Sequence, residues 1–385
     1  MISTSTNSSS KKNETTISQV RLSDSSSDSS SYEDEKLDIK SEEGLISEHQ
    51  EQIKQHNQTK TYKTNKIDKY QIEISLIALI ILNLLNKFEN FQPYTHKFLQ
   101  LQYKYPETNY YDIGKDDIYV VITGMFAATF IRAFSMHYIL KPLAKFNKIY
   151  SQKDKQRFME QGWCVMLYAS SFSVGSWLYY HSSYFNNFDN FYINWPHDEM
   201  SGLFKLYYLM SIASWSQQIF TLNIEAKRKD HYQMFSHHII TVALVIGSYY
   251  YYFTRIGNVI LVIMDFVDIL LSTAKLLKYC GYQNLCDFMF GVFVLGWIAL
   301  RHGVYNYIFY HAATKARDLM VSGRCIDGLI QKRCYTDRIV DVFLSLLGGL
   351  QIITLIWMYL IAKVIIKVLT GNGADDVRSD DEDDD

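Results

Sequence analysis

Four ionisable residues lie within one otherwise apolar stretch of the chain. His237 and His238 are adjacent, and Asp265 and Asp268 follow at a spacing of three residues. An imidazole can act as a general base whose tautomer a carboxylate fixes, or as a nucleophile that accepts an acyl group. One histidine pair offers too few ligands for a membrane di-iron site, and we expect no metal. The other interpretation is structural, with these side chains satisfied by neighbours in a buried core.

The pattern predicts a helical hairpin over residues 232–275, with its turn near Thr254–Gly257. His237 and Asp268 lie eight and seven residues from the charged ends of this hairpin, which corresponds to roughly 12 Å and 10 Å along a helix. The histidines and aspartates are therefore expected at a similar depth. Asp265 and Asp268 share a helix face, whereas adjacent histidines diverge by roughly 100° and both face one cavity only if it is wide.

Other residues of the hairpin are candidates for binding or support. Thr241 lies on the same helix as the histidines, and Lys227, Arg228 and Lys229 precede that helix at its mouth. The basic cluster could bind the phosphates of a substrate. The alternative interpretation is that it anchors the helix end at the membrane surface.

Charged residues also occur in two other apolar segments. Arg301 and His302 lie in the segment 288–310, and Arg132 lies in 118–140. The orientation of the helices predicts that Arg301 and His302 lie toward the luminal end, far from the histidines, where a structural role is expected. Arg132 is expected to form a buried pair with a polar partner.

These side chains must be positioned by helices that cross a membrane. A bilayer core requires about 20 predominantly apolar residues in a helix. Segments without Asp, Glu, Lys or Arg cover 161–188, 206–224, 231–254 and 342–362, and segments with few charges cover 118–140, 256–274 and 288–310. An eighth, about 70–88, is shorter and could be interfacial. The sequence predicts an all-α polytopic membrane protein with seven or eight transmembrane helices.

The distribution of lysine and arginine predicts the orientation. The loop Lys141–Arg157 is rich in lysine and is placed in the cytosol, whereas the loop 181–202 has no Lys or Arg and is placed in the lumen. Eight spans then leave both termini in the cytosol. The segment 311–340 is the exception, because it carries six Lys/Arg and yet should be luminal.

The chain divides into four regions. Residues 1–69 form a Ser-rich, disordered cytosolic tail; 70–111 contain the first helix and a loop; 112–370 form the membrane domain; and 371–385 form an acidic tail. Ser379 precedes acidic residues, as in the targets of acidophilic kinases, although the tail could simply be solubilising. A net charge of −2 argues against a nucleic-acid binder.

Five cysteines are too few for a disulfide framework. Cys325 and Cys334 both lie in the segment 311–340. If that segment is luminal, a disulfide between them is expected, because the lumen is oxidising.

The stretch Lys227–Tyr279 is similar to the signature sequence of the ceramide synthases, a branch of the TLC-domain membrane proteins. It contains the basic entry, the paired histidines with Thr241, a tyrosine run, Thr254-Arg255-x-Gly257 and Asp265-x-x-Asp268. The motif Phe293-x-x-x-Trp297-x-x-x-Arg301-His302 resembles the next helix of that family. The resemblance covers about residues 112–370.

The sequence departs from the animal members of this family at two positions. Met264 stands where animal members usually have His, and Ser272 stands where they usually have Glu. The segment between the first two spans is also too short for a homeobox-like domain. These features resemble the fungal branch.

The resemblance implies a TLC-type helical bundle in which about six helices surround a central cavity. It implies an N-acyltransferase that joins a fatty acyl group from acyl-CoA to the amine of a sphingoid long-chain base, giving ceramide and CoA without a further cofactor. His237 or His238 would remove the amine proton or carry the acyl group, Asp265 and Asp268 would orient them, and the basic cluster would contact CoA phosphates. The alternative is a non-catalytic lipid-binding or translocon-associated relative.

The resemblance also implies residence in the endoplasmic reticulum membrane. A homodimer or a small single-span accessory subunit is a further implied partner. The residues do not determine the acyl chain length, the long-chain base, or whether transfer passes through an acyl-histidine. The segment 311–340 and the residues that close the cavity are candidates for setting chain length.

Overall fold

The computed structural model describes residues 70–369 except 225–229, 327, 329 and 332. The predicted N-terminal tail, the acidic tail with Ser379, and the basic cluster Lys227, Arg228 and Lys229 lie outside the described residues. Every element below belongs to one compact unit, Lys66–Asp385.

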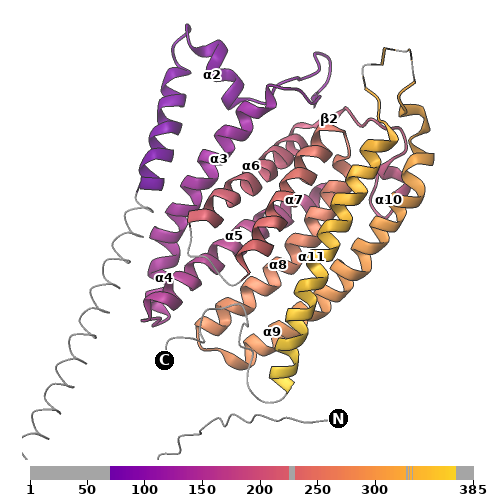
Figure 1. Ribbon diagram of the computed structural model, residues 1–385. Helices are drawn as coiled ribbons and strands as arrows, with labels where there is room; N and C mark the ends of the chain where they lie inside the picture. Colours follow the sequence, from indigo (N-terminus) through magenta and orange to yellow (C-terminus); the bar gives the residue numbers. More distant parts are fainter. Residues whose placement is uncertain (1–69, 225–229, 327, 329, 332, 370–385) are drawn as a thin grey trace, which may run out of the picture. The chain divides into compact units, whose positions relative to one another are not determined.

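The described part is almost entirely helical (Figure 1). Its single small sheet pairs β1 (Tyr110–Tyr111) with β2 (Met200–Ser201) in antiparallel fashion. An apolar helix covers Tyr70–Leu85. The other helices are α2 (Gln92–Leu99), α3 (Asp117–Phe134), η1 (Ser135–Leu140), α4 (Lys141–Phe146), α5 (Gln152–Tyr180), η2 (Phe188–Phe191), α6 (Gly202–Ile224), α7 (His231–Tyr250), α8 (Thr254–Tyr279), α9 (Gln283–Gly296), η3 (Trp297–Val304), α10 (Tyr305–Leu319), η4 (Val321–Gly323) and α11 (Asp337–Leu369).

Three helical stretches in the described part are both long and apolar enough to cross a membrane. They are Asp117–Phe146, Gln283–Leu319 and Asp337–Ile366. Helices α5 to α8 have 20 to 29 residues, which is sufficient length, but their polar residues lower their hydropathy. The structure therefore shows a helical membrane domain. The helix Tyr70–Leu85 is shorter than these three stretches.

The helix ends differ from the sequence-based expectation in three places. Helix α5 ends at Tyr180, so the last part of the charge-free run 161–188 lies in the loop that follows. The turn of the hairpin lies between Tyr250 and Thr254, so Thr254–Gly257 begins α8 instead of forming the turn. The segment 311–340 is not one loop, because α10 extends to Leu319 and α11 begins at Asp337.

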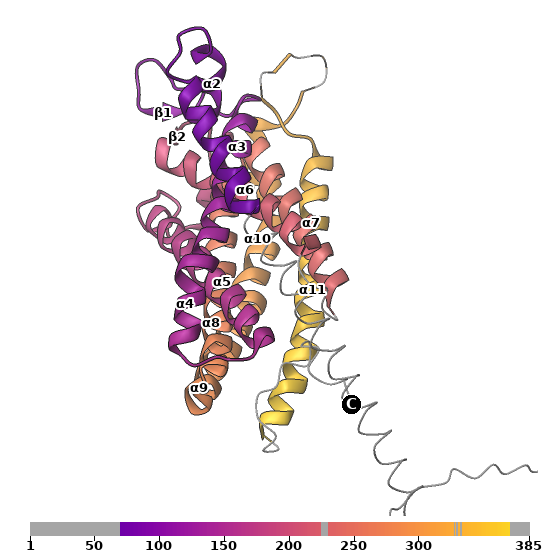
Figure 2. The same ribbon diagram turned by 90° about the vertical axis from the view of Figure 1, so that its left-hand side faces the viewer.

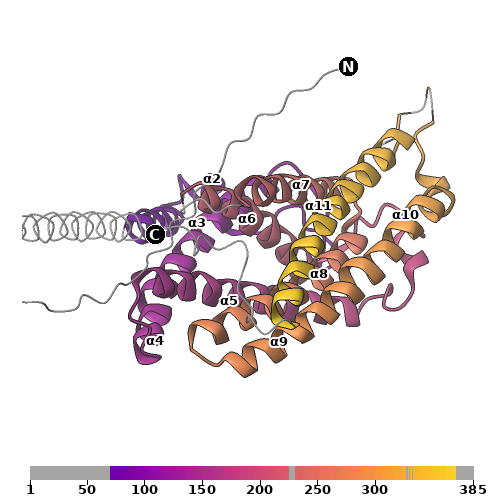
Figure 3. The ribbon, with the colours of Figure 1, turned by 60° about the horizontal axis from the view of Figure 1, so that its bottom comes forward.

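The helices pack in an order that differs from their order in the chain. Helix α8 packs along α5 and against α9, while α6 packs between α3 and α7. Helix α11 packs against both α7 and α10, so the last helix meets the hairpin that carries the paired histidines (Figures 2 and 3). Helices far apart in sequence therefore share one interior.

Four connecting segments pack together at one end of the bundle. Trp195 from the loop after α5 donates its indole N–H to the Tyr251 carbonyl at 3.1 Å, and its ring lies 5.3 Å from that of Tyr335. Arg333, from the connection between α10 and α11, forms ion pairs with Asp112 and Asp198. These contacts bind the α10–α11 connection to the rest of that end.

The same connection contains a disulfide bond between Cys325 and Cys334. The bond and the Arg333 ion pairs together hold a segment that has little regular structure. The remaining cysteines, Cys164, Cys280 and Cys286, are not part of a disulfide bond.

Candidate active site

Two cavities lie inside the bundle. The first, here called the polar cavity, encloses about 290 Å³ and is lined by residues of α3, α5, α6, α7, α8, α9, η3 and α11. The second, here called the apolar cavity, encloses about 90 Å³. It lies between α6, α7, α8, η3, α10 and α11, with Tyr192 from the loop after α5 also on its wall.

Four residues line both cavities: Trp215, His237, Asp268 and Arg301. They come from α6, α7, α8 and η3 respectively. The two cavities therefore share one stretch of wall, here called the junction, where an imidazole, a carboxylate and a guanidinium come together. A ligand with one polar and one apolar part could occupy both cavities and place the bond between these parts at the junction.

His237 is enclosed by aromatic rings. Its ring centroid lies 5.1 Å from that of Trp357 and 5.7 Å from that of Trp215. The His238 ring is perpendicular to it at 5.5 Å. Among the described residues, Nδ1 of His237 has no hydrogen-bond partner. This imidazole is therefore held by packing and retains a nitrogen for a ligand.

His238 has a different environment. It lines the polar cavity only, and its Nδ1 lies 2.7 Å from the carbonyl oxygen of Met234. A carbonyl oxygen can only accept, so Nδ1 carries the hydrogen, and Nε2 of the neutral ring keeps its lone pair. His238 therefore presents a basic nitrogen in a defined tautomer. Both histidines line the polar cavity, although adjacent residues of a helix point in directions roughly 100° apart.

Arg301 binds Asp268 directly, with Nη2 2.7 Å from Oδ1. The same nitrogen lies 3.3 Å from the Met264 carbonyl, and the guanidinium stacks 4.3 Å from the centre of the Trp297 ring. The expectation that Arg301 lies far from the histidines is therefore wrong. Helices α9, η3 and α10 form one stretch of 37 residues, Gln283–Leu319, and Arg301 lies midway along it instead of near its end.

His302 supports the junction from outside the two cavities. Its Nε2 accepts the indole N–H of Trp297 at 3.1 Å, and its Nδ1 lies 2.9 Å from the side-chain amide of Gln351 on α11. It thereby joins η3 to α11 and orients the ring on which Arg301 stacks. The structural role that the sequence predicted for His302 agrees with these contacts.

The two aspartates of the hairpin are not equivalent. Asp268 lines both cavities, whereas Asp265 lines neither of them and is only 2% exposed. Among the described residues, Oδ2 of Asp265 has no hydrogen-bond partner. The shared helix face therefore leaves only Asp268 at the junction.

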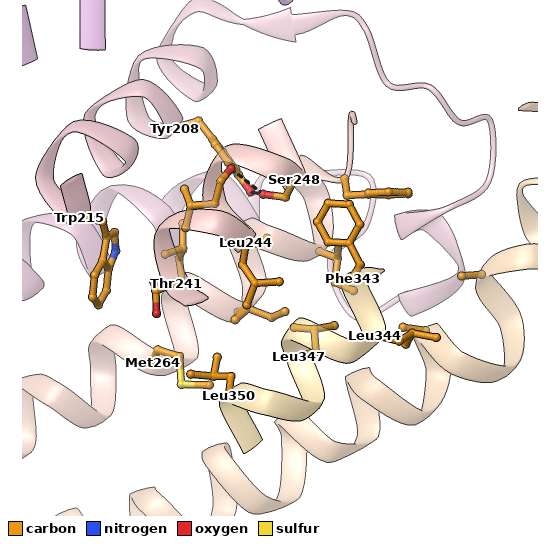
Figure 4. Close-up of a pocket in the computed structure, with 18 of the residues that line it drawn as sticks. Tyr208, Trp215, Thr241, Leu244, Ser248, Met264, Phe343, Leu344, Leu347 and Leu350 are labelled. Atoms are coloured by element: carbon orange, nitrogen blue, oxygen red, sulfur yellow. Dashed lines mark hydrogen bonds between the residues drawn. The ribbon is translucent and has the colours of Figure 1, made fainter. Parts of the chain in front are cut away.

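The apolar cavity extends from the junction toward the α10–α11 connection. Figure 4 shows Leu244, Phe343, Leu347 and Leu350 along its wall, with a 2.6 Å hydrogen bond between the hydroxyls of Tyr208 and Ser248. Thr241 also lines this cavity, and its hydroxyl has no partner among the described residues. At the far end lie Ala316, Met320 and Val340. Such a wall suits a hydrocarbon chain.

The polar cavity carries cations that the sequence analysis did not assign to a site. Arg157 on α5 and Lys275 and Lys278 on α8 line it, together with Arg132 on α3. Arg132 is buried and lies 3.4 Å from the side-chain oxygen of Gln71, so the expected polar partner is present. For Arg157, Lys275 and Lys278, the only sign of such a place in the sequence was their position near the ends of apolar segments. No three His, Cys, Asp or Glu side chains of the described part converge as metal ligands.

The chain was compared with known proteins. The model of the TLC domain matches residues 157–363. A sphingosine N-acyltransferase-like protein of Alternaria alternata is 40% identical over 71% of this chain and 69% of its own. A ceramide synthase of Gibberella moniliformis is 35% identical over 76% and 74%, and a sphingosine N-acyltransferase of Schizosaccharomyces pombe is 36% identical over 82% and 80%.

The chain belongs to the ceramide synthase family. These fungal relatives confirm the resemblance that the signature sequence carried. The family match includes the paired histidines, both aspartates and Arg301, so all junction residues of this ceramide synthase relative lie inside the TLC domain.

Proposed function

We propose that this chain is a ceramide synthase, which transfers a fatty acyl group from acyl-CoA to the amine of a sphingoid long-chain base. The observation that carries the proposal is the junction of a polar and an apolar cavity at His237, Asp268 and Arg301. The activities after which its relatives are named support the same function. They do not favour the alternative of a non-catalytic lipid-binding protein.

The charges of the two cavities suggest how acyl-CoA would lie. The CoA phosphates would enter the polar cavity beside Arg157, Lys275 and Lys278, and Lys227, Arg228 and Lys229 precede α7 in the chain. The acyl chain would run into the apolar cavity past Thr241. The thioester would then lie at the junction beside His237.

The two histidines would have separate tasks. His237 would attack the thioester carbon, forming an acyl-imidazole and releasing CoA. His238, with Nδ1–H held by Met234, would take the proton from the attacking amine at Nε2. Arg301 would hold Asp268 in place, and the pair would balance charge as the imidazole becomes cationic. The amine nitrogen would bond to the acyl carbon as the bond from that carbon to His237 breaks, and the amide product would then leave with the acyl chain.

The proposed setting is the endoplasmic reticulum membrane, with seven or eight spans and both termini in the cytosol. Three arginines of the segment 311–340, the exception to the positive-inside rule, form ion pairs with acids. Their partners are Asp337 and Asp341 for Arg317, Asp337 for Arg324, and Asp112 and Asp198 for Arg333. The disulfide between Cys325 and Cys334 suits a luminal position. A homodimer or a single-span subunit would be an additional partner.

The test uses microsomes that contain the chain, with His237→Ala and His238→Ala at matched expression. Labelled long-chain base and acyl-CoA donors from C16 to C26 are supplied, and the products are identified by mass spectrometry. Ceramide from the wild type, lost in both variants, is the expected result. Absence of ceramide with every donor, from folded wild-type protein co-expressed with a single-span subunit, would contradict the proposal.

The order of steps is tested without long-chain base. Purified wild type and His238→Ala, incubated with acyl-CoA alone, should each gain the mass of one acyl group on the peptide containing His237. His237→Ala should gain none. Ceramide formation by a wild type that never carries this adduct would show direct transfer instead.

A further inference from the structure

An unpartnered indole N–H lies beside the junction. Trp357 on α11 lines the polar cavity, is 5% exposed, and has its ring centroid 5.1 Å from that of His237. Among the described residues, its Nε1 has no hydrogen-bond partner. Buried N–H groups nearly always have a partner in the protein or in ordered water. Its side chain lies on the wall of the polar cavity, where a ligand could supply the missing acceptor.

Two other buried tryptophans of the chain differ in this respect. Trp297 donates to His302 at 3.1 Å, and Trp195 donates to the Tyr251 carbonyl at 3.1 Å. Packing alone therefore does not account for Trp357, because a phenylalanine would fill a similar apolar space without burying an unpaired donor. Of these three tryptophans, Trp357 is the one whose ring contacts that of His237.

A second unpartnered donor lies at the same junction. Nε of Arg301 has no partner among the described residues, although Nη2 of the same guanidinium binds Asp268. Arg301 comes from η3 and Trp357 from α11. The two side chains therefore come from different helices, and both line the polar cavity together with His237.

We propose that the indole N–H of Trp357, with Nε–H of Arg301, binds the thioester oxygen of acyl-CoA and stabilises its charge during acyl transfer. When a nitrogen of His237 bonds to the carbonyl carbon, the π electrons of the carbonyl move to the oxygen. That oxyanion accepts a hydrogen bond from each of the two N–H groups. It then reforms the carbonyl as the carbon–sulfur bond breaks and CoA leaves as the thiolate.

This role rests on the proposed ceramide synthase function and adds a residue to it. Donors that are fixed before the reaction and aimed at a developing oxyanion lower the barrier, because they need no reorganisation as the charge forms. The aromatic surroundings of Trp357 suit this role, since a low dielectric strengthens the interaction with the oxyanion. The hydrophobic cluster around it contains Val267, Phe293, Trp297 and Ile353.

The experiment compares wild type with Trp357→Phe, which removes the N–H and keeps an aromatic ring. Loss of one such donor should lower kcat by about 100-fold while KM for acyl-CoA changes by less than about threefold. Affinity for an S-alkyl-CoA thioether, which has the chain and the nucleotide but no carbonyl, should be unchanged. Trp195→Phe is the matched control: it also removes a buried indole N–H, lines neither cavity, and should keep the wild-type kcat per folded enzyme.

Two outcomes would overturn the assignment. One is a kcat for Trp357→Phe within about threefold of wild type. The other is an equal loss of kcat and of thioether affinity, which would show that Trp357 shapes the cavity only. A wild type that makes no ceramide, while still binding the thioether, would instead count against the proposed function.

Discussion

At the scale of single residues, the structure gives different environments to residues that look equivalent in the sequence. His237 lines both cavities, whereas His238 lines one and has its tautomer set by Met234. Asp268 pairs with Arg301, whereas Asp265 lies outside both cavities. The Asp268–Arg301 pair therefore supplies the opposite charges that lie at the junction.

Replacing Arg301 with methionine should lower both activity and stability. It leaves the Asp268 carboxylate, whose side chain is 23% exposed, without this cation. Breaking a buried pair costs about 3–5 kcal/mol, and partial exposure reduces the expected loss to about 2–3 kcal/mol. Thermal unfolding in detergent measures the loss, and ceramide formation measures the activity.

The double variant distinguishes charge from packing. Asp268→Asn combined with Arg301→Met should regain part of the lost stability, because no carboxylate is then left without the guanidinium, but it should stay inactive. Arg338→Met, at an exposed position of α11, serves as the control and should match the wild type. A double variant no more stable than Arg301→Met alone would show that packing of the guanidinium, not its charge, stabilises the junction.

At the scale of elements, the structure depends on close approach of three helices around the apolar cavity. Gly257 in the first turns of α8 lies against Tyr208 of α6, which is hydrogen-bonded to Ser248 of α7. A Cβ at Gly257 would lie 1.8 Å from the Tyr208 hydroxyl and 3.1 Å from the Ser248 hydroxyl. The glycine is thus what permits α6, α7 and α8 to meet here.

Gly257→Ala should therefore destabilise the bundle by about 1–3 kcal/mol, the usual cost of overpacking a core. It should also lower activity, because Gly257 and Tyr208 both line the apolar cavity. Combination with Tyr208→Phe removes the clashing oxygen and should restore part of the stability. Thermal unfolding in detergent measures both effects.

Gly348→Ala provides the control for this variant. A Cβ at Gly348 on α11 would meet no atom within 4 Å, so this change should leave stability and activity as in the wild type. Equal stability of the Gly257→Ala and Gly348→Ala variants would show that Tyr208 moves aside without cost.

A second feature at this scale is the π-helix η3, which carries both Arg301 and His302. π-Helical turns are frequent at functional sites, because the extra residue changes the direction in which the side chains point. Here Arg301 binds Asp268 of α8 while His302 binds Gln351 of α11. Adjacent residues thereby reach two different helices.

At the scale of the whole molecule, the proposed acyl chain lies in a cavity whose far end is formed by α10, α11 and their connection. Ala312 and Ala316 of α10 line this end. The disulfide and the Arg333 ion pairs hold the connection close by. The volume left at this end should therefore limit the length of the acyl chain.

Ala316→Phe should shift the donor preference toward shorter acyl groups, because the added ring occupies space that the end of a long chain would fill. Each methylene that is no longer buried costs about 0.8 kcal/mol. The kcat/KM for the longest donor that the wild type accepts should fall about tenfold relative to the C16 donor. Competition between C16 and longer donors, read by mass spectrometry, measures the ratio.

Ala313→Phe tests whether this effect is specific. Ala313 lies three residues before Ala316 on the same helix and does not line the apolar cavity. It should leave the donor ratio unchanged. An unchanged ratio in Ala316→Phe as well would mean that the acyl chain does not occupy this cavity.

The helical membrane class and the family could be determined from the sequence. Long runs without charge, as in 342–362, require helices, because a bilayer leaves no other partner for the backbone of a single segment. The paired histidines and the aspartates within such runs marked the hairpin that we propose to be catalytic, since buried ionisable groups are costly and mark functional sites. These signals are local in the chain.

Only the tertiary structure decided which of these residues meet. Counting residues along a helix gives depth but not rotation, and this is why Asp265 and Asp268 could not be separated. Arg301 was misplaced because the sequence does not show that η3 packs against α8, where Arg301 binds Asp268. Trp357 had no signal at all: its place beside His237 follows from the packing of α11 on α7, and an apolar helix is compatible with many such packings. Sequence patterns thus determined the elements, and contacts between distant helices determined the site.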